Sequence, residues 1–237
     1  MTGILAIETA TDACSVALYR DGEVTDIHEV TPRAHSQRLL GMLQELLPDG
    51  DLVAAGVDAI AYGCGPGSFT GLRIAASAVQ GLAYSARLPA ISVSTLACQA
   101  QSALRLGLLQ PDHLVLSTID ARINEIYAAL YSIDSEAPVH MQGPFACPAQ
   151  QLPLDIAPDA RIVAIGSGVA FVPQMPPALQ QCITQTYSDL LPAARDLIPL
   201  ALAQFAAGDV QAPHEVQPIY VRDKISWKKL SEQGPGS

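Results

Sequence analysis

A glycine-rich loop between an apolar run and an alanine-rich run constrains this chain more than any other feature. The loop spans residues 63–71 and contains four glycines and one proline. Residues 57–62 before it predict a strand, and residues 70–86 after it predict a helix. Glycine is needed where φ is positive or where another group approaches the backbone closely. The helix start would offer free N–H groups to an anion or a partner, although a tight turn without any ligand fits the same spacing.

Composition limits the possible partners. The chain has 237 residues, of which 49% are hydrophobic and 15% charged, so it can fill the cores of two small domains. Its formal net charge is −10, and its pI is about 4.7. Because phosphate contacts need Lys and Arg, an acidic chain binds RNA poorly by itself. If RNA is the substrate, we expect another subunit to hold it.

The cysteines and the hydropathy pattern indicate a cytoplasmic protein. Five widely spaced cysteines form no Cys-x-x-Cys pair, so we expect reduced thiols that mostly fill the core. Cys64 alone lies in the glycine loop, but no His or Asp nearby marks it as a nucleophile. The chain opens without a basic, apolar leader, and it has no apolar run of about 18 residues, so we expect no membrane attachment.

The first part of the chain predicts a lobe over residues 1–106. Three strands come first, the second and third joined by the hairpin signal Asp21-Gly22, and helices and strands then alternate. The predicted strands are 4–7, 14–19, 23–30, 57–62 and 89–93, and the predicted helices are 32–47, 70–86 and 96–106. This order indicates an actin-like or ribonuclease-H-like α/β fold, with an ordinary meander as the alternative for its first strands.

A second, smaller lobe is predicted over residues 107–218, and a C-terminal arm and tail over 219–237. Two paired strands open the second lobe, which suggests an internal duplication of the first. We expect strands over 113–119, 125–133 and 161–165, a helix over 196–207, loops in the proline-rich stretches 137–158 and 173–177, and a late strand or ordered arm over 219–227.

Three loops could cradle a phosphate, namely residues 8–12, 63–71 and 166–168, because backbone N–H groups can bind phosphate without basic side chains. Lys and Arg are nevertheless absent from the first and third loops, and Arg73 is the only basic residue at the second. No Walker A, Gly-x-Ser-x-Gly or His-Glu-x-x-His pattern appears, and the histidines form no ligand pair. We therefore predict no catalytic, cofactor or metal site, with an independent nucleotide-binding or hydrolytic enzyme as the alternative.

Two helices are candidates for a protein interface. Helix 70–86 is rich in Ala, Gly and Ser, which allow a close approach of another helix, and helix 32–47 carries a stripe of leucines. Packing on the lobe's own sheet would explain both features equally well. The predicted interface residues are Leu39, Leu43, Gly67, Arg73, Ala76 and Gln80. If the loop acts through its backbone, Gly67→Val should act through folding or partner binding, and a positive φ at this position would make a β-branched residue costly.

Five segments in order resemble the bacterial TsaB (YeaZ) family. They read ILAIETATDACSVAL, RAHSQRLLGMLQELL, GCGPGSFTGLRIAASAVQGLAYSARLPAISVSTLA, IDARINEIYAALY and PIYVRDKISWKK. Residues 132–191 contribute little to the resemblance. It implies a two-lobed member of the Hsp70–actin–sugar-kinase superfamily with a degenerate nucleotide site.

The resemblance also implies a function and partners. TsaB proteins are non-catalytic scaffolds or activators of the enzyme TsaD, which with TsaE transfers a threonylcarbamoyl group to adenosine 37 of tRNA. The expected partners are TsaD in a heterodimer, TsaE through that complex, a second copy of the chain when TsaD is absent, and tRNA only indirectly. The catalytic relative carries a His-x-Glu-x-His metal motif, and the matching residues here are 95–99, Thr-Leu-Ala-Cys-Gln. No metal or other cofactor is therefore expected.

Overall fold

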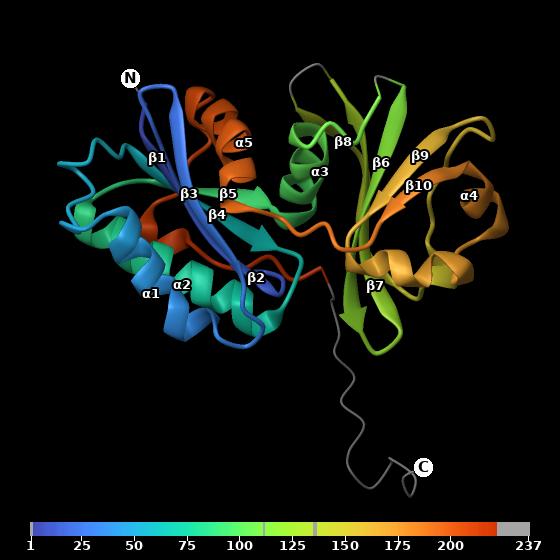
Figure 1. The fold of residues 1–237 in the computed structure, drawn as a ribbon, viewed down its shortest axis with the longest axis horizontal. Coiled ribbons are helices and arrows are strands. Elements are labelled where there is room, and N and C mark those ends of the chain that lie inside the picture. The colour runs from blue at the N-terminus through green and yellow to red at the C-terminus, as the bar shows by residue number, and fades with distance from the viewer. Residues whose placement is uncertain (1, 111, 135–136, 222–237) are drawn as a thin grey trace, which may run out of the picture.

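The chain forms two lobes, each built on one mixed five-stranded sheet (Figure 1). The computed structural model describes residues 2–110, 112–134 and 137–221. The first sheet has the order β3-β2-β1-β4-β5 and contains β1 (Ile4–Glu8), β2 (Ala13–Arg20), β3 (Glu23–Val30), β4 (Ala59–Gly65) and β5 (Ala90–Ser94). The second has the order β10-β9-β6-β7-β8 and contains β6 (His113–Arg122), β7 (Glu125–Ile133), β8 (Pro138–Cys147), β9 (Arg161–Ile165) and β10 (Ile183–Tyr187).

The two sheets have the same topology, so the expected internal duplication is confirmed. In the first lobe, β1 pairs with β2 antiparallel and with β4 parallel, and β5 extends the sheet in parallel beyond β4. In the second lobe, β6 pairs with β7 antiparallel and with β9 parallel, and β10 extends the sheet beyond β9. Together with the helices, this arrangement is the expected actin-like α/β fold.

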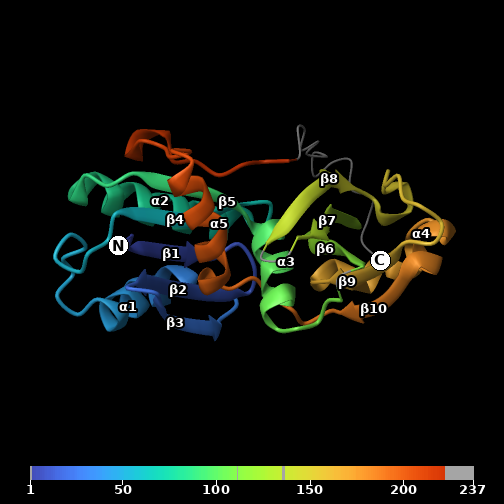
Figure 2. The same cartoon turned by 90° about the horizontal axis from the view of Figure 1, so that it is seen from above.

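Helices cover both faces of the first sheet. Helices α1 (His35–Leu46) and α2 (Phe69–Ala86) lie on one face, and α5 (Ala194–Ala206) lies on the other (Figure 1). Helix α3 (Thr95–Arg105) lies between the two lobes, as the view from above shows (Figure 2). The second lobe adds α4 (Pro177–Cys182) and the 3₁₀ segments η1 (Ala149–Gln151) and η2 (Ser167–Gln174), and η3 (Pro213–Glu215) precedes the C-terminal arm. None of the helices in the described ranges is long and apolar enough to span a bilayer.

Strand β1 shows why its sequence is apolar at four successive positions. Leu5 and Ile7 are buried in the core under α1 and α2, and Ile4 and Ala6 are buried in the core under α5. Successive side chains of a strand point to opposite faces. A central strand covered by helices on both faces therefore has no exposed position for a polar residue.

Two strands of the second lobe were not predicted. The stretch 137–158 was expected to be a loop, but residues 138–147 form the edge strand β8, and β10 forms the opposite edge. Proline is tolerated on an edge strand because one side of that strand has no neighbour that needs its N–H. Pro138 stands first in β8, and Pro144 lies where the register with β7 shifts. Proline content therefore misled the prediction.

The last helix returns to the first lobe. Helix α5 was predicted within the lobe 107–218, but Leu197, Ile198 and Ala201 are buried with Ile4 and Ala6 of β1. The second lobe is therefore an insertion between α3 and α5 rather than the whole of residues 107–218. In the predicted C-terminal arm, residues 219–221 are neither strand nor helix, and residues 222–237 lie outside the described residues.

A buried ion pair joins α3 to α5. Arg105 Nε lies 2.6 Å from Asp196 Oδ1, and Ser102 Oγ donates to Asp196 Oδ2 at 2.6 Å. The Asp196 side chain is 2% exposed and that of Arg105 35% exposed. The pair therefore anchors the inter-lobe helix to the first lobe.

We expect Arg105→Leu to lower the free energy of unfolding by about 3 kcal/mol, because it leaves the Asp196 carboxylate buried without a cation. Arg161→Leu is the control, since Arg161 and Asp112 form a pair that is 50% and 56% exposed and should contribute less than about 1 kcal/mol. Urea unfolding monitored by circular dichroism measures both. Equal effects of the two substitutions would contradict the anchoring role of Asp196.

Candidate functional site

The glycine loop closes directly on the turn that follows β1. Ser68 N donates to the carbonyl oxygen of Ala10 at 2.7 Å, and Thr9 Oγ1 donates to that of Gly71 at 2.8 Å. At the start of α2, Gly71 N donates to Ser68 Oγ and Leu72 N to the Ser68 carbonyl. A phosphate at a helix N-terminus would need N–H groups of this kind. The chain itself already satisfies those of Ser68 and Gly71.

Glu8 lies at the bottom of this contact and is fully buried. Its Oε1 accepts from Ala10 N at 2.6 Å, and its Oε2 accepts from Thr95 Oγ1 at 3.4 Å. A Cβ at Gly63 would overlap the Glu8 carboxyl group, so glycine makes room for it. Burial raises the pKa of Glu8 to about 7. Such a pKa suits a general acid or base, but no surface path reaches a carboxyl with no exposed area.

The third candidate phosphate loop, residues 166–168, packs on α3. A Cβ at Gly166 would meet the Gln99 amide. Gln99 is 1% exposed; its Nε2 donates to the Leu190 carbonyl at 2.7 Å, and its Oε1 accepts from Ser117 Oγ at 2.7 Å. Thr95 and Gln99 therefore hold α3 against Glu8 and β6.

Neither a thiol nucleophile nor a metal cluster is apparent near these loops. Cys64 is 3% exposed, and burial raises the pKa of its thiol to about 12. A thiol at that pKa is protonated at neutral pH and is a poor nucleophile. Within the described ranges, no group of three or more His, Cys, Asp or Glu side chains could bind a metal ion.

The six predicted interface residues differ in their exposure to solvent. Leu39, Leu43 and Ala76 are 2%, 8% and 6% exposed and belong to the core between the first sheet and its helices. These three residues are not on the surface. The apolar stripe that recurs most regularly along a helix is the side that packs against the helix's own sheet. Arg73 and Gln80 are exposed.

Gly67 is half-buried, and its φ is not positive. Within the loop, the positive φ, 119°, belongs to Gly65 instead. Gly67 is required for a different reason, since a Cβ on it would lie 2.8 Å from the Cβ of Ala10. The glycine allows the loop to touch the first turn.

The open face of α2 is a stripe of which the sequence analysis named only Arg73 as an interface residue. Phe69 is 51% and Tyr84 79% exposed, at the two ends of the helix. Arg73, Ser77 and Gly81 lie between them at intervals of four residues and are also exposed. A Cβ at Gly81 would meet nothing within 4 Å. Glycine inside a helix is less favourable than Ala by about 1 kcal/mol, and no contact with the described residues explains Gly81.

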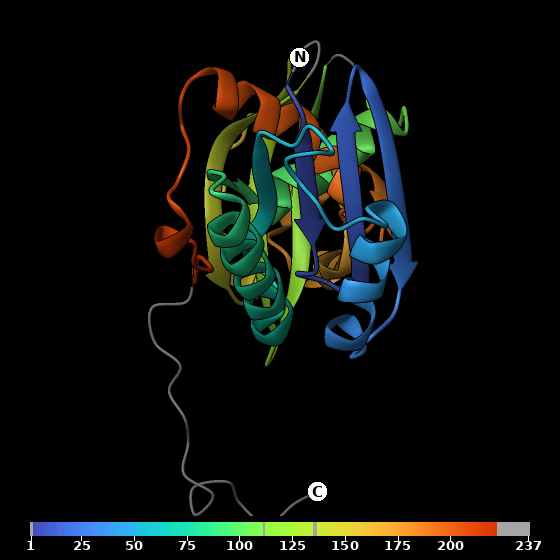
Figure 3. The ribbon, with the colours of Figure 1, turned by 90° about the vertical axis from the view of Figure 1, so that its left-hand side faces the viewer.

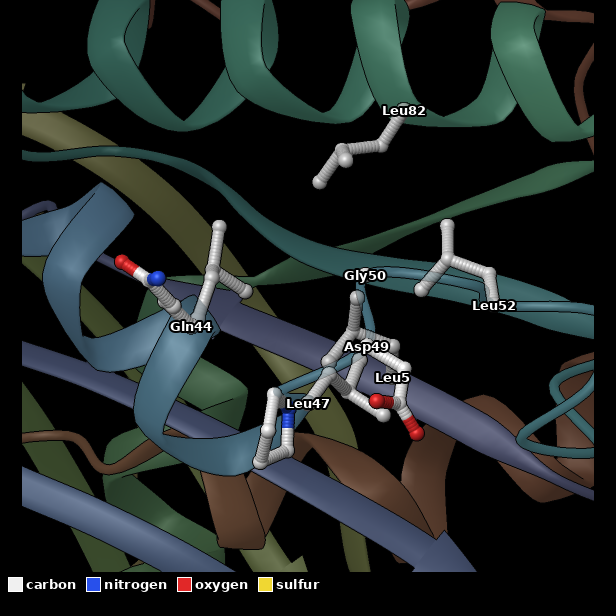
Figure 4. A pocket seen from close by; sticks show the side chains of 9 residues that line it. Leu5, Gln44, Leu47, Asp49, Gly50, Leu52 and Leu82 are labelled. Carbon is white, nitrogen blue, oxygen red and sulfur yellow. The ribbon is translucent and has the colours of Figure 1, made fainter.

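A groove runs between α1 and α2 beside this face, on the side of the first lobe seen in Figure 3. One part of it, about 580 Å³, is lined by exposed Leu40 of α1 and by Phe69, Ile74 and Ala78 of α2. A second pocket of about 280 Å³ lies near the end of α1. Figure 4 shows Leu82 of α2 facing α1 and the following loop across this pocket. The groove is mostly apolar and can accept apolar side chains.

The C-terminal arm lies against the start of α2. Ile219 N donates to the Cys64 carbonyl at 2.8 Å. Arg73 Nε donates to Tyr220 Oη at 3.2 Å, and the Phe69 and Tyr220 rings lie 5.7 Å apart. The Arg73 guanidinium also lies 3.8 Å from the centre of the Phe69 ring. One end of the open face is therefore continuous with the arm.

Comparisons relate this chain to known proteins by sequence and by structure. Residues 26–182 match the family model described as TsaD, tRNA N6-adenosine threonylcarbamoyltransferase. The chain is 40% identical over 229 residues to the tRNA threonylcarbamoyladenosine biosynthesis protein TsaB of Escherichia coli, covering 96% of this chain and 97% of that one. It is 37% identical over 238 residues to the Haemophilus influenzae protein of the same name, covering 96% of each. The structure of YeaZ from Pseudomonas aeruginosa, 37% identical, superimposes with a TM-score of 0.85 over 93% of this chain and 100% of that one.

The pKa of Glu8 predicts a pH dependence of stability. The pKa of Glu8 is about 7 in the folded chain against an ordinary value of 4.5 for a glutamate side chain, so the folded chain holds the proton more tightly. Stability from this group is full below about pH 4.5 and is lost as the pH rises through about 7, a loss of about 3 kcal/mol. Glu8→Gln removes the titration. We therefore expect the stability of the variant relative to wild type to rise by that amount between pH 4.5 and 8, measured by urea unfolding. A constant difference would mean that Glu8 does not titrate in this range.

The loop contact predicts opposite effects for two glycines of the same region. Gly67→Ala should destabilise the chain by about 1–3 kcal/mol, because its methyl group collides with Ala10. Gly81→Ala should raise the stability by up to about 1 kcal/mol, because its methyl group meets open space. Thermal and urea unfolding of both variants measure the difference. If Gly67→Ala were as stable as Gly81→Ala, the loop would not depend on close approach to the first turn.

Proposed function

This chain belongs to the TsaB (YeaZ) family, and we propose that it is the non-catalytic subunit that holds the threonylcarbamoyltransferase TsaD in a productive conformation. The two would together present the surface that recruits TsaE, in the cytoplasm. The product would be threonylcarbamoyl-adenosine at position 37 of tRNA. The chain itself would carry out no chemical step.

One observation supports a non-catalytic role most strongly. The helix N-terminus and the first turn, which would cradle phosphate in a nucleotide-using relative, bond to each other through Ser68 and Ala10. The acidic group nearest to them, Glu8, is fully buried. Reactants could not reach the Glu8 carboxyl without the separation of α2 from β1.

The open face of α2 and the groove beside it support a role in partner binding. Because Ser77 and Gly81 have small side chains or none, the middle of the open face protrudes less than its ends. The large side chains of Phe69 and Tyr84 lie at those ends. A helix of the partner could approach this low strip closely, with its apolar side chains in the groove. The unexplained Gly81 fits this arrangement, because its lack of a side chain becomes useful only when another backbone arrives. We propose the same face for a homodimer that forms when TsaD is absent.

A nucleotide titration tests the alternative of an independent enzyme. We expect the purified chain to show no ATP-dependent shift of its melting temperature in the presence of Mg²⁺. A shift of several degrees would favour a nucleotide-binding enzyme, since a ligand that binds only the folded state raises its stability.

Ser77→Arg tests the proposed face. The side chain is exposed, so the variant should fold with the stability of wild type, while a bulky charge occupies the strip that a partner backbone must approach. We expect its affinity for TsaD to fall at least about 100-fold, in isothermal titration calorimetry, with a parallel loss of tRNA modification.

Two further variants make the result interpretable. Thr186→Arg adds the same side chain on the exposed edge of the second sheet and should leave TsaD binding unchanged. Ala76→Arg should fail to fold, because Ala76 is in the core. Normal TsaD binding by the Ser77 variant would refute the proposed face.

A further inference from the structure

The turn between β6 and β7 combines backbone strain with an exposed apolar side chain. Arg122 of β6 pairs with Glu125 of β7, so Ile123 and Asn124 form the tip of this hairpin, and their φ values are 56° and 58°. Positive φ at both central positions is typical of a type I′ turn, which favours Asn and Gly. Ile123 is the one β-branched residue with a positive φ in the part of the chain that the structure describes. A β-branched side chain is an outlier in that conformation.

Neighbouring groups hold the turn in this strained conformation. Asp120 N donates to Ser167 Oγ at 3.0 Å, and Arg122 N donates to Asp120 Oδ1 at 2.8 Å. The Arg122 guanidinium also lies 3.2 Å from Asp120 Oδ2, so the basic residue of the turn is paired with an acid. The tip therefore presents an apolar side chain rather than a free cation. It suits an apolar pocket on a protein better than the phosphates of RNA.

The folding of the chain does not explain the isoleucine at the tip. At 80% exposure, Ile123 is the most exposed large apolar side chain among the described residues, so it stabilises no core. In the first lobe, the turn after β1 takes the same place in the topology, and there Thr9 and Ala10 are buried. The second lobe leaves its counterpart open to solvent. Because strained residues cluster at functional sites, the tip indicates a contact with another molecule.

The tip lies at the same end of the molecule as the start of α2, which is the lower end in Figures 1 and 3. A partner on the open face of α2 would lie on the near side in Figure 3, in front of the first lobe. The hairpin belongs to the second lobe, which lies behind the first in that view. Such a partner would therefore leave the tip free. A third subunit at the lower end could touch both that partner and the tip.

We propose that Ile123 is the point where this chain contacts TsaE, with its side chain in an apolar pocket of that subunit. This inference rests on the proposed function, in which TsaD occupies the open face of α2 and the complex recruits TsaE. The strained turn holds the side chain away from its own lobe before TsaE arrives. TsaE would bury apolar surface that the chain leaves in water, and such burial favours association.

Two substitutions at this position separate the apolar contact from the strain. Asn accepts a positive φ but is polar, whereas Leu is apolar and is not branched at Cβ. Because it relieves strain, Ile123→Asn should raise the melting temperature of the chain by about 2–4 °C. In isothermal titration calorimetry, we expect the affinity of its complex with TsaD for TsaE to fall at least about tenfold. Ile123→Leu should keep the affinity for TsaE within about threefold of wild type.

Val139→Asn is the control, because Val139 is a 47% exposed apolar side chain of β8 in the same lobe. It should leave the affinity for TsaE unchanged, and none of the three substitutions should change the affinity for TsaD.

Four results would overturn the inference. Ile123→Asn could bind TsaE as wild type does, it could melt below wild type, or Ile123→Leu could lose as much affinity for TsaE as Ile123→Asn. The fourth is a loss of TsaD binding by Ile123→Asn, since the tip would then contact TsaD instead. If the wild-type chain and TsaD fail to associate, or if their complex fails to recruit TsaE, it is the proposed function that fails.

Discussion

The first lobe depends on the contact between the turn after β1 and the glycine loop before α2. Three glycines make the contact possible: Gly63 leaves room for the Glu8 carboxyl, Gly67 for Ala10 and Gly71 for the Thr9 carbonyl. The hydrogen bonds of Ser68 and Thr9 then fix the first turn of α2 against β1. Because this contact sets where α2 starts, it also sets which face of the helix is buried and which is left open.

The same contact is the reason why we propose a non-catalytic role for the chain. In a nucleotide-using protein of this fold, the first turn and the glycine loop would hold a phosphate between them. Here the first turn and the glycine loop are hydrogen-bonded to each other. The Glu8 carboxyl group beneath them is buried, and its pKa is raised to about 7. The contact between the loop and the first turn uses the Ser68 N–H, but it leaves the outer side of α2 free. We propose that the lobe serves as a docking platform for this reason. The second lobe repeats the topology, and Gln99 fills the corresponding space beside Gly166.

Strong local signals let the sequence predict much of the first lobe. The apolar run of β1 and the hairpin at Asp21-Gly22 lie where they were expected, and so does the strand–loop–helix around residues 63–71, except that β4 continues three residues further, to Gly65. Strands β8 and β10 were missed because edge strands tolerate the prolines and polar residues that normally indicate loops. The return of α5 to the first sheet could not be predicted, since its apolar face would fit either sheet equally well.

The candidate face was predicted only in part for a related reason. The sequence pointed to α1 and α2 and to Arg73 and Gln80, but a leucine stripe marks the side that a helix buries in its own lobe. Leu39 and Leu43 follow that rule. The better signal was the set of residues out of phase with that stripe, such as Leu40, Phe69 and Tyr84, which are large, apolar and exposed. The fit of Gly67 against Ala10 required coordinates, because it joins residues that are far apart in the sequence.

The central claim is that the closed interior of the first lobe does no chemistry. The most direct measurement is the rate of tRNA threonylcarbamoylation by TsaD and TsaE reconstituted with Glu8→Gln in place of the wild-type chain. Because Gln can accept from Ala10 N through Oε1 and donate to Thr95 Oγ1 through Nε2, without a titratable proton, the account predicts a rate within about twofold of wild type. A loss of 100-fold or more, with binding to TsaD unchanged, would show that the Glu8 carboxyl takes part in the reaction and would contradict the account.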